Sequence, residues 1–204
     1  TFKKTNTNTM LQFNVEIQEN YSRSQLLLRT FFGWIYIMIP HLFLLWFIMI
    51  GAAVLQIITF WTIMFTGKFP KDWFDFQVNA MRWNARLSST LWNFRDEYPE
   101  FGLNAEQPGV DLQVTYQEQV SRSSVLVRAL FGGIYVMIPH GICLFFRSIA
   151  SQVLMILAFW VVLFTKKYPA DWHKFNIGTL RWSYRVNAYL SFLTHDYPEF
   201  SGKE

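Results

Sequence analysis

The distribution of charge along the chain limits its possible folds more than any other feature. Residues 30–67 form a stretch of 38 residues without Asp, Glu, Lys or Arg. About 20 apolar helical residues cross the hydrocarbon core of a bilayer, so this stretch is too long for one straight span and suits two short ones. The second half carries two apolar runs of near-membrane length, separated by Arg147. The chain therefore has the pattern of a membrane protein.

Arg147 suggests where each pair of spans would turn. An arginine at the bilayer centre costs at least about 2.5 kcal/mol, which favours a water-facing tip for this residue. The first half has Gly51 near the corresponding place. We therefore predict two transmembrane helical hairpins, over residues 25–67 and 124–166.

Composition excludes several classes of protein. Apolar residues make up 52% of the chain and charged residues only 16%, against about 25% charged in a typical soluble domain. A chain this apolar does not stay unfolded in water, which excludes a disordered protein. Cys143 is the single cysteine, which excludes a disulfide scaffold and a thiolate zinc site.

The chain contains an internal duplication. Residues 22–101 align with residues 121–200 at an offset of 99 without a gap, and about 36 of the 80 pairs are identical. We predict a first repeat over 10–102, a linker over 103–109 and a second repeat over 110–204. An even number of spans in each repeat makes the two copies parallel, related by a pseudo-two-fold axis along the membrane normal.

Each repeat begins with alternating apolar residues, which predict a short β-strand. They are Phe13, Val15 and Ile17 in the first copy, and Leu112, Val114 and Tyr116 in the second. A single strand is not stable alone, so we expect the two strands to pair with each other outside the membrane.

After the apolar stretch, each repeat has the pattern of an amphipathic helix, over residues 70–95 and 169–194. Arginine and tryptophan lie together on these helices, a combination that suits the headgroup region of a bilayer. The residues expected to bind lipid or the interface are Arg82, Trp83, Arg86, Arg181, Trp182 and Arg185. Alternatively, these arginines anchor the helix without specificity or form ion pairs with Asp96, Glu97 or Asp196.

Taken together, these patterns predict an all-α integral membrane protein with a minor strand in each repeat. Lys and Arg cluster at the outer ends of the predicted hairpins. By the positive-inside rule, both termini and the linker lie in the cytoplasm.

Several duplicated motifs, in order, resemble an uncharacterised family of bacterial membrane proteins, domain-of-unknown-function family 4389. The motifs are Ser-Arg, Ile-Pro-His, Phe-Thr-x-Lys-aromatic-Pro, Arg-Trp-x-x-Arg and a closing Tyr-Pro-x-Phe. The resemblance covers almost the whole chain, twice over. It implies a multi-pass protein of the bacterial cytoplasmic membrane, and it implies no known activity.

The Ile-Pro-His motifs place His41 and His140 beside Pro40 and Pro139, near the expected bilayer centre. Ionisable groups at that depth are functional candidates. The two histidines could form a proton path or ligate one haem. The interpretation we favour is that each neutral histidine bonds the backbone carbonyl that the preceding proline leaves free. Two histidines are too few for a typical closed metal site, so we expect no metal.

The sequence contains none of the catalytic motifs sought, such as a P-loop or a Gly-x-Ser-x-Gly elbow. We therefore expect a non-enzymatic membrane subunit or scaffold that organises a larger assembly. Its expected partners are the bilayer and other membrane subunits or a second copy, without nucleic acid and without a cofactor. The alternatives are a transporter of a small solute, protons or lipid that uses the histidines, and a haem-binding electron-transfer subunit.

Overall fold

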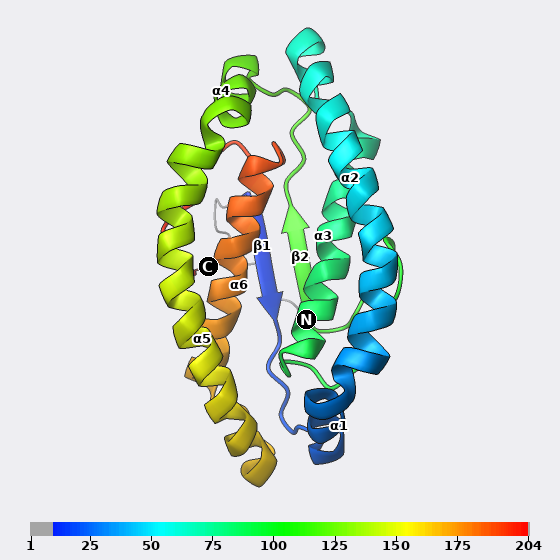
Figure 1. Ribbon diagram of the computed structural model, residues 1–204, viewed down its shortest axis with the longest axis vertical. Coiled ribbons are helices and arrows are strands. Elements are labelled where there is room, and N and C mark those ends of the chain that lie inside the picture. Colours follow the sequence, from blue (N-terminus) through cyan, green and yellow to red (C-terminus); the bar gives the residue numbers. More distant parts are fainter. Residues whose placement is uncertain (1–9, 204) are drawn as a thin grey trace.

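The structure is a computed structural model that describes residues 10–203. The first repeat consists of β1 (Leu11–Val15), α1 (Arg23–Gly33), the π-helical segment η1 (Trp34–Met38), α2 (Ile39–Thr66) and α3 (Lys71–Leu91). The second repeat has the same order: β2 (Val110–Val114), α4 (Arg122–Gly132), η2 (Gly133–Met137), α5 (Ile138–Thr165) and α6 (Ala170–Leu190). Figure 1 shows the two copies side by side.

The predicted hairpins over 25–67 and 124–166 are wrong, because each is one continuous helix. The first long helix runs over Arg23–Thr66 and the second over Arg122–Thr165, and each has 44 residues. Gly51 and Arg147 both lie within these helices. A glycine inside a helix costs only about 1 kcal/mol relative to alanine, so Gly51 does not force a turn.

Arg147 does not need the water-facing tip that we expected. Its Nε donates to Thr179 Oγ1 at 2.9 Å and its Nη2 donates to the carbonyl of Phe175 at 3.2 Å, both on α6. The guanidinium also lies 4.2 Å from the centre of the Phe175 ring. Because α6 satisfies the charge, the second long helix continues through this position.

The ends of the long helices follow from local sequence. Ser22 and Ser121 accept hydrogen bonds from the backbone N–H groups of Gln25 and Ser124, as N-caps do. At the other ends, Gly67 and Lys166 adopt left-handed backbone conformations, with φ of 73° and 60°.

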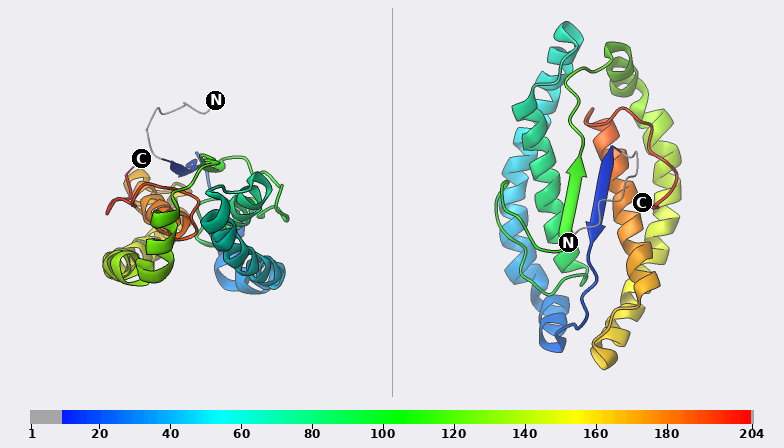
Figure 2. Two further views of the ribbon diagram at one scale, coloured as in Figure 1. Left: turned by 90° about the horizontal axis from the view of Figure 1, so that it is seen from above. Right: turned by 180° about the vertical axis from the view of Figure 1, so that it is seen from behind.

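The two strands pair antiparallel, which confirms the predicted strand pairing. Figure 2 shows three layers: the sheet, then α3 and α6, then the two long helices. The predicted amphipathic helices therefore form the middle layer. They end at Leu91 and Leu190, a few residues earlier than predicted.

The two long helices run in opposite directions along the molecule (Figure 1). Arg23 Nη2 donates to the carbonyl of Phe164 at 2.7 Å, and Arg122 Nη2 donates to that of Phe65 at 3.1 Å. Each helix start thus meets the end of the other helix. The pseudo-two-fold axis is therefore perpendicular to the sheet and to the long helices.

Candidate functional site

His41 lies at the centre of an aromatic cluster in the first repeat. Its side chain is fully buried. Trp83 Nε1 on α3 donates a hydrogen bond to His41 Nδ1 at 2.9 Å. The Phe101 ring stacks on the imidazole with ring centres 3.8 Å apart, and the Tyr98 ring is centred 5.5 Å away. We call His41, Trp83, Tyr98 and Phe101 the first histidine cluster.

Tyr98 compensates for the proline before this histidine. In a regular α-helix, the N–H of residue 40 would bond the carbonyl of Tyr36, but Pro40 has no N–H. The Tyr98 hydroxyl donates to that carbonyl at 3.1 Å. Partial burial raises the pKa of Tyr98, which keeps the hydroxyl protonated as a donor. The π-helical segment η1 lies directly before Ile39-Pro40. There the backbone hydrogen bonds span five residues, as in the bond from the Ile39 N–H to the Trp34 carbonyl, instead of four.

The second repeat contains the same arrangement, formed by His140, Trp182, Tyr197 and Phe200. We call these residues the second histidine cluster. Trp182 Nε1 donates to His140 Nδ1 at 2.8 Å, and Phe200 stacks on the imidazole at 3.9 Å. Tyr197 donates to the carbonyl of Tyr135 at 2.9 Å, which is the carbonyl opposite Pro139.

These contacts correct the interpretation that we favoured for the histidines. The carbonyl opposite each proline is bonded by a tyrosine, and each histidine accepts from a tryptophan instead. Because Nδ1 accepts, the proton of the neutral imidazole is on Nε2. Neither Nε2 has a hydrogen-bond partner among residues 10–203. The ring contacts of each histidine lie within its own repeat, so the structure does not bring His41 and His140 together.

The arginines expected at the lipid interface point into the protein or bond its backbone. Arg82 Nε donates to the carbonyl of Leu112, at the outer edge of β2, and Arg181 Nε donates to the carbonyl of Phe13, at the outer edge of β1. Arg86 is buried and donates to three loop carbonyls, those of Glu100, Gly102 and Ala105. Trp83 and Trp182 are buried in the histidine clusters.

Arg185 corresponds to Arg86 in the second repeat. It is buried, and its Nε and Nη1 have no hydrogen-bond partner among the described residues. The spacing of arginine and tryptophan that the two repeats share therefore places these side chains within the packing of the middle layer.

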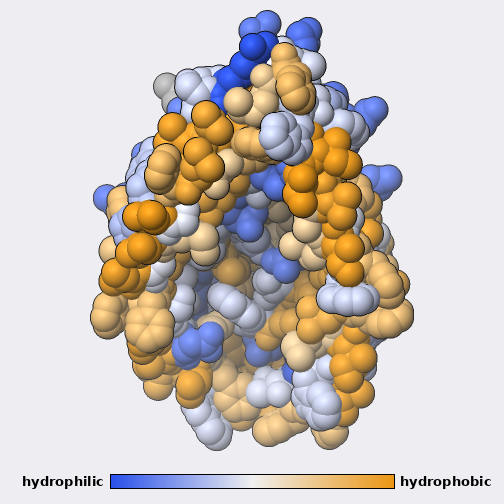
Figure 3. Space-filling model, turned by 45° about the horizontal axis from the view of Figure 1, so that its top comes forward, coloured by the Kyte–Doolittle hydropathy of each residue, from blue (hydrophilic) through white to orange (hydrophobic). Residues whose placement is uncertain are grey.

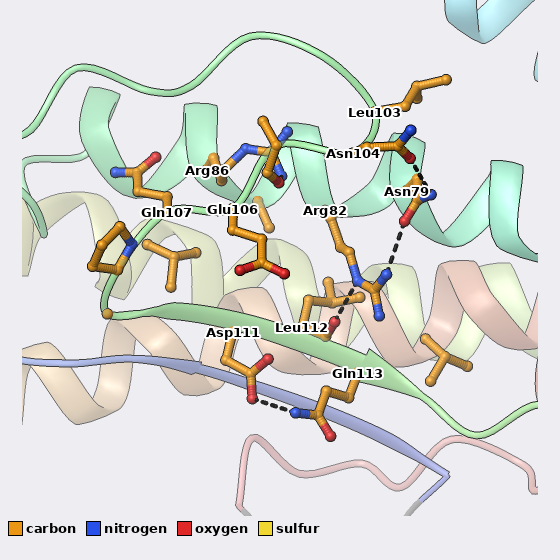
Figure 4. A pocket seen from close by; sticks show the side chains of 16 residues that line it. Asn79, Arg82, Arg86, Leu103, Asn104, Glu106, Gln107, Asp111, Leu112 and Gln113 are labelled. Atoms are coloured by element: carbon orange, nitrogen blue, oxygen red, sulfur yellow. Dashed lines mark hydrogen bonds between the residues drawn. The ribbon is translucent and has the colours of Figure 1, made fainter. Parts of the chain in front are cut away.

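A polar cavity of about 870 Å³ lies between α3, the linker and β2. Arg82 and Glu106 extend into the space between the helix and the strand (Figure 4). Gln107 is buried at its wall, and neither polar atom of its amide has a partner in the part of the chain that the structure describes. β2 forms the wall of this cavity opposite α3.

A second buried arginine, Arg29 in the first repeat and Arg128 in the second, has different partners in the two repeats. In the first repeat, Arg29 Nη2 forms a salt bridge with Asp96 at 2.8 Å, and Asp96 also accepts from the backbone N–H of Ser22. In the second repeat, Arg128 is equally buried, but His195 occupies the position of Asp96. Arg128 lies instead over the Tyr189 ring at 4.6 Å and donates to backbone carbonyls.

The outer face of the long helices is apolar and exposed. Apart from Ile17 and four aromatic loop residues, the exposed large apolar side chains of the described chain all lie on the two long helices. Figure 3 shows these side chains along both helices, with polar side chains in the hollow between them. Both helices are long and apolar enough to cross a membrane.

Comparison with known proteins identifies the family from these repeats. The family model described as "Domain of unknown function (DUF4389)" matches residues 23–102 and again residues 122–202. The chain belongs to the DUF4389 family. Neither the curated proteins nor the solved structures contain a match.

Each DUF4389 copy contains one complete histidine cluster. Both the Ile-Pro-His motif and the closing Tyr-Pro-Glu-Phe motif lie within the matched ranges. The closing Tyr-Pro-x-Phe motif was used above only as part of the family resemblance, so Tyr98, Phe101, Tyr197 and Phe200 were not among the predicted site residues. The duplication of this motif was the available signal, because a plain helix stop does not require two aromatic residues at fixed spacing.

No group of three or more His, Cys, Asp or Glu side chains that could hold a metal ion occurs among residues 10–203. The histidine clusters present one imidazole each, surrounded by aromatic rings and a tryptophan donor. Such an arrangement can hold each long helix in a fixed position against the neighbouring helix of the middle layer.

Proposed function

We propose that this protein is a non-enzymatic membrane protein that anchors or organises a larger assembly. The observation that supports this proposal best is the one-sided distribution of its surface. The exposed apolar side chains gather on the long helices, while the opposite layer is a two-stranded sheet with polar outward residues. An exposed apolar surface of this extent marks a membrane or protein interface.

The polar layer is the part available to other subunits. Asn14 and Gln113 are exposed on the strands, and β2 also lines the cavity between α3 and the linker. The histidines and most of the arginines are engaged in internal contacts, which supports a structural role for them. The transport and haem alternatives remain predictions, and neither histidine cluster offers a second imidazole.

Native mass spectrometry of the protein, extracted from its own membranes in mild detergent, tests this proposal. We expect other subunits to co-purify at a fixed stoichiometry. Asn14→Arg should release them, because it places a charge on the outer face of the sheet. Asn20→Arg is the matched control, since Asn20 is also exposed but lies in the loop after β1. A protein that is extracted only as a lone chain would overturn the scaffold proposal.

A further inference from the structure

The length of the long helices does not fit an upright orientation. A helix of 44 residues measures about 66 Å, whereas the hydrocarbon core of a bilayer is about 30 Å thick. An upright helix would extend far beyond the bilayer on both sides. The exposed apolar residues nevertheless continue along the helices, from Leu27 to Phe65 in the first and from Leu126 to Phe164 in the second.

The positions of α3 and the sheet are a second argument against an upright orientation. Trp83 on α3 bonds His41, and Phe76 on α3 lies against Gly51, so α3 follows the middle of the first long helix. An upright helix would therefore place α3 and the sheet at the depth of the hydrocarbon. Open sheet edges do not occur in lipid, because their backbone groups cannot find partners there.

The charges at the ends of the long helices also argue against an upright orientation. Arg23 meets the end of the second long helix, near the exposed Lys166 and Lys167, and Arg122 meets the end of the first. The two ends of the molecule are therefore both basic. A spanning protein has its excess of Lys and Arg on the cytoplasmic side, so an upright orientation would break this asymmetry.

We infer that the two long helices lie flat in one leaflet, parallel to the membrane plane, with the sheet facing water. This inference rests on the proposed membrane function and specifies its geometry. Because the pseudo-two-fold axis is perpendicular to the sheet, both long helices lie on the side of the molecule away from it (Figure 2). The apolar side chains of both helices are visible from this side (Figure 3). In this orientation that axis coincides with the membrane normal.

The basic ends identify a lipid leaflet, rather than a second copy, as the partner of this face. Arg23 and Arg122 form no ion pair among the described residues, whereas Lys68 is paired with Glu118. Two copies joined through their apolar faces would bring basic ends together and repel each other. Anionic lipid headgroups would neutralise the same groups, as they do for basic amphipathic helices in the interface.

The depth of three labels along the second long helix tests the inference. Cys143, the single cysteine, is exposed near the middle of this helix. Leu130→Cys and Ile156→Cys, each in a Cys143→Ser background, place labels 13 residues to either side, about 20 Å along the helix. Both replaced residues are exposed. The full chain is reconstituted in phosphatidylcholine–phosphatidylglycerol vesicles, and nitroxide depth is measured from relaxation by oxygen and by a water-soluble nickel complex.

We expect the three labels to lie at one depth, within about 10 Å, the diameter of a helix. A label at Gln113→Cys on the sheet should be fully exposed to the nickel complex. A profile with Cys143 about 20 Å deeper than both flanking labels would overturn the flat orientation and leave the membrane proposal intact. Failure of the protein to float with the vesicles would overturn the membrane proposal itself. Labels shielded from both relaxation agents, with spin–spin coupling between chains, would identify a second copy as the partner and overturn the inference.

Discussion

Phe13 lies directly opposite Leu112 in the sheet, and these two residues are counterparts in the two repeats. Their numbers differ by 99, the offset of the duplication, and the neighbouring pairs extend symmetrically to Leu11↔Val114 and Val15↔Val110. The pseudo-two-fold axis therefore passes through this pair. Since neither strand would be stable alone, the sheet couples the two repeats into one body.

His41→Ala should destabilise the protein, because it leaves the buried Trp83 N–H without an acceptor and opens a cavity against Phe101. An unpaired buried donor alone costs about 1–3 kcal/mol. Chemical unfolding in detergent, followed by tryptophan fluorescence, measures the change. We expect a similar loss of stability for His140→Ala. If either variant kept wild-type stability and lost only a transport activity, the structural role would be contradicted and the transport alternative favoured.

Tyr98→Phe should cost about 0.5–1.5 kcal/mol, the net value of a typical hydrogen bond. The reason is that Tyr98 bonds the Tyr36 carbonyl that Pro40 cannot reach. Pro40→Ala restores an N–H at position 40, so Tyr98→Phe should cost much less in that background. A double-mutant cycle from unfolding free energies measures the coupling. Equal costs in both backgrounds would show that the tyrosine does not compensate for the proline.

His195→Asp should stabilise the second repeat by about 1–3 kcal/mol, because it gives the buried Arg128 the carboxylate that Arg29 has. The reciprocal variant, Asp96→His, should destabilise the first repeat, since it leaves Arg29 without its carboxylate partner. Unfolding free energies of both variants provide the comparison. A loss of stability in His195→Asp would mean that the ring contacts of Arg128 already satisfy its charge.

Stability should fall between about pH 6.5 and pH 4 because of His173. Burial, with a smaller contribution from the charge of Arg95, lowers the pKa of His173 from 6.5 to about 4. The unfolded chain therefore binds a proton in this range that the folded chain does not, so the contribution is complete above pH 6.5 and is lost as the pH falls. The shift corresponds to roughly 3 kcal/mol.

His173→Phe isolates this effect, because the first repeat has Phe74 at the equivalent position and the ring contacts with Phe94 and Tyr168 are kept. The difference in unfolding free energy between the variant and the wild type should grow from pH 7 to pH 4.5. A constant difference would show that His173 is not the titrating group.

The sequence predicted those features that depend on local composition and repetition. The two strands at Phe13 and Leu112 and the two amphipathic helices follow from periodicity within one segment, and the duplication follows from the identities between the two halves of the sequence. The partners of the charged side chains could not be predicted, because they come from residues far along the chain. Arg147 was placed at a hairpin tip because Thr179 and Phe175, on another helix, were not visible as its partners.

By itself, the sequence determined that this chain is a tandem duplication with two long apolar segments, of which the first is uncharged and the second contains Arg147. Charge and repetition depend only on the order of residues. Only the tertiary structure decided that each segment is one helix, that Trp83 rather than a carbonyl bonds His41, and that the two long helices are antiparallel. The physical reason is that a helix continues wherever its polar groups are satisfied. For Tyr36 and Arg147, the groups that satisfy them lie 62 and 32 residues away along the chain.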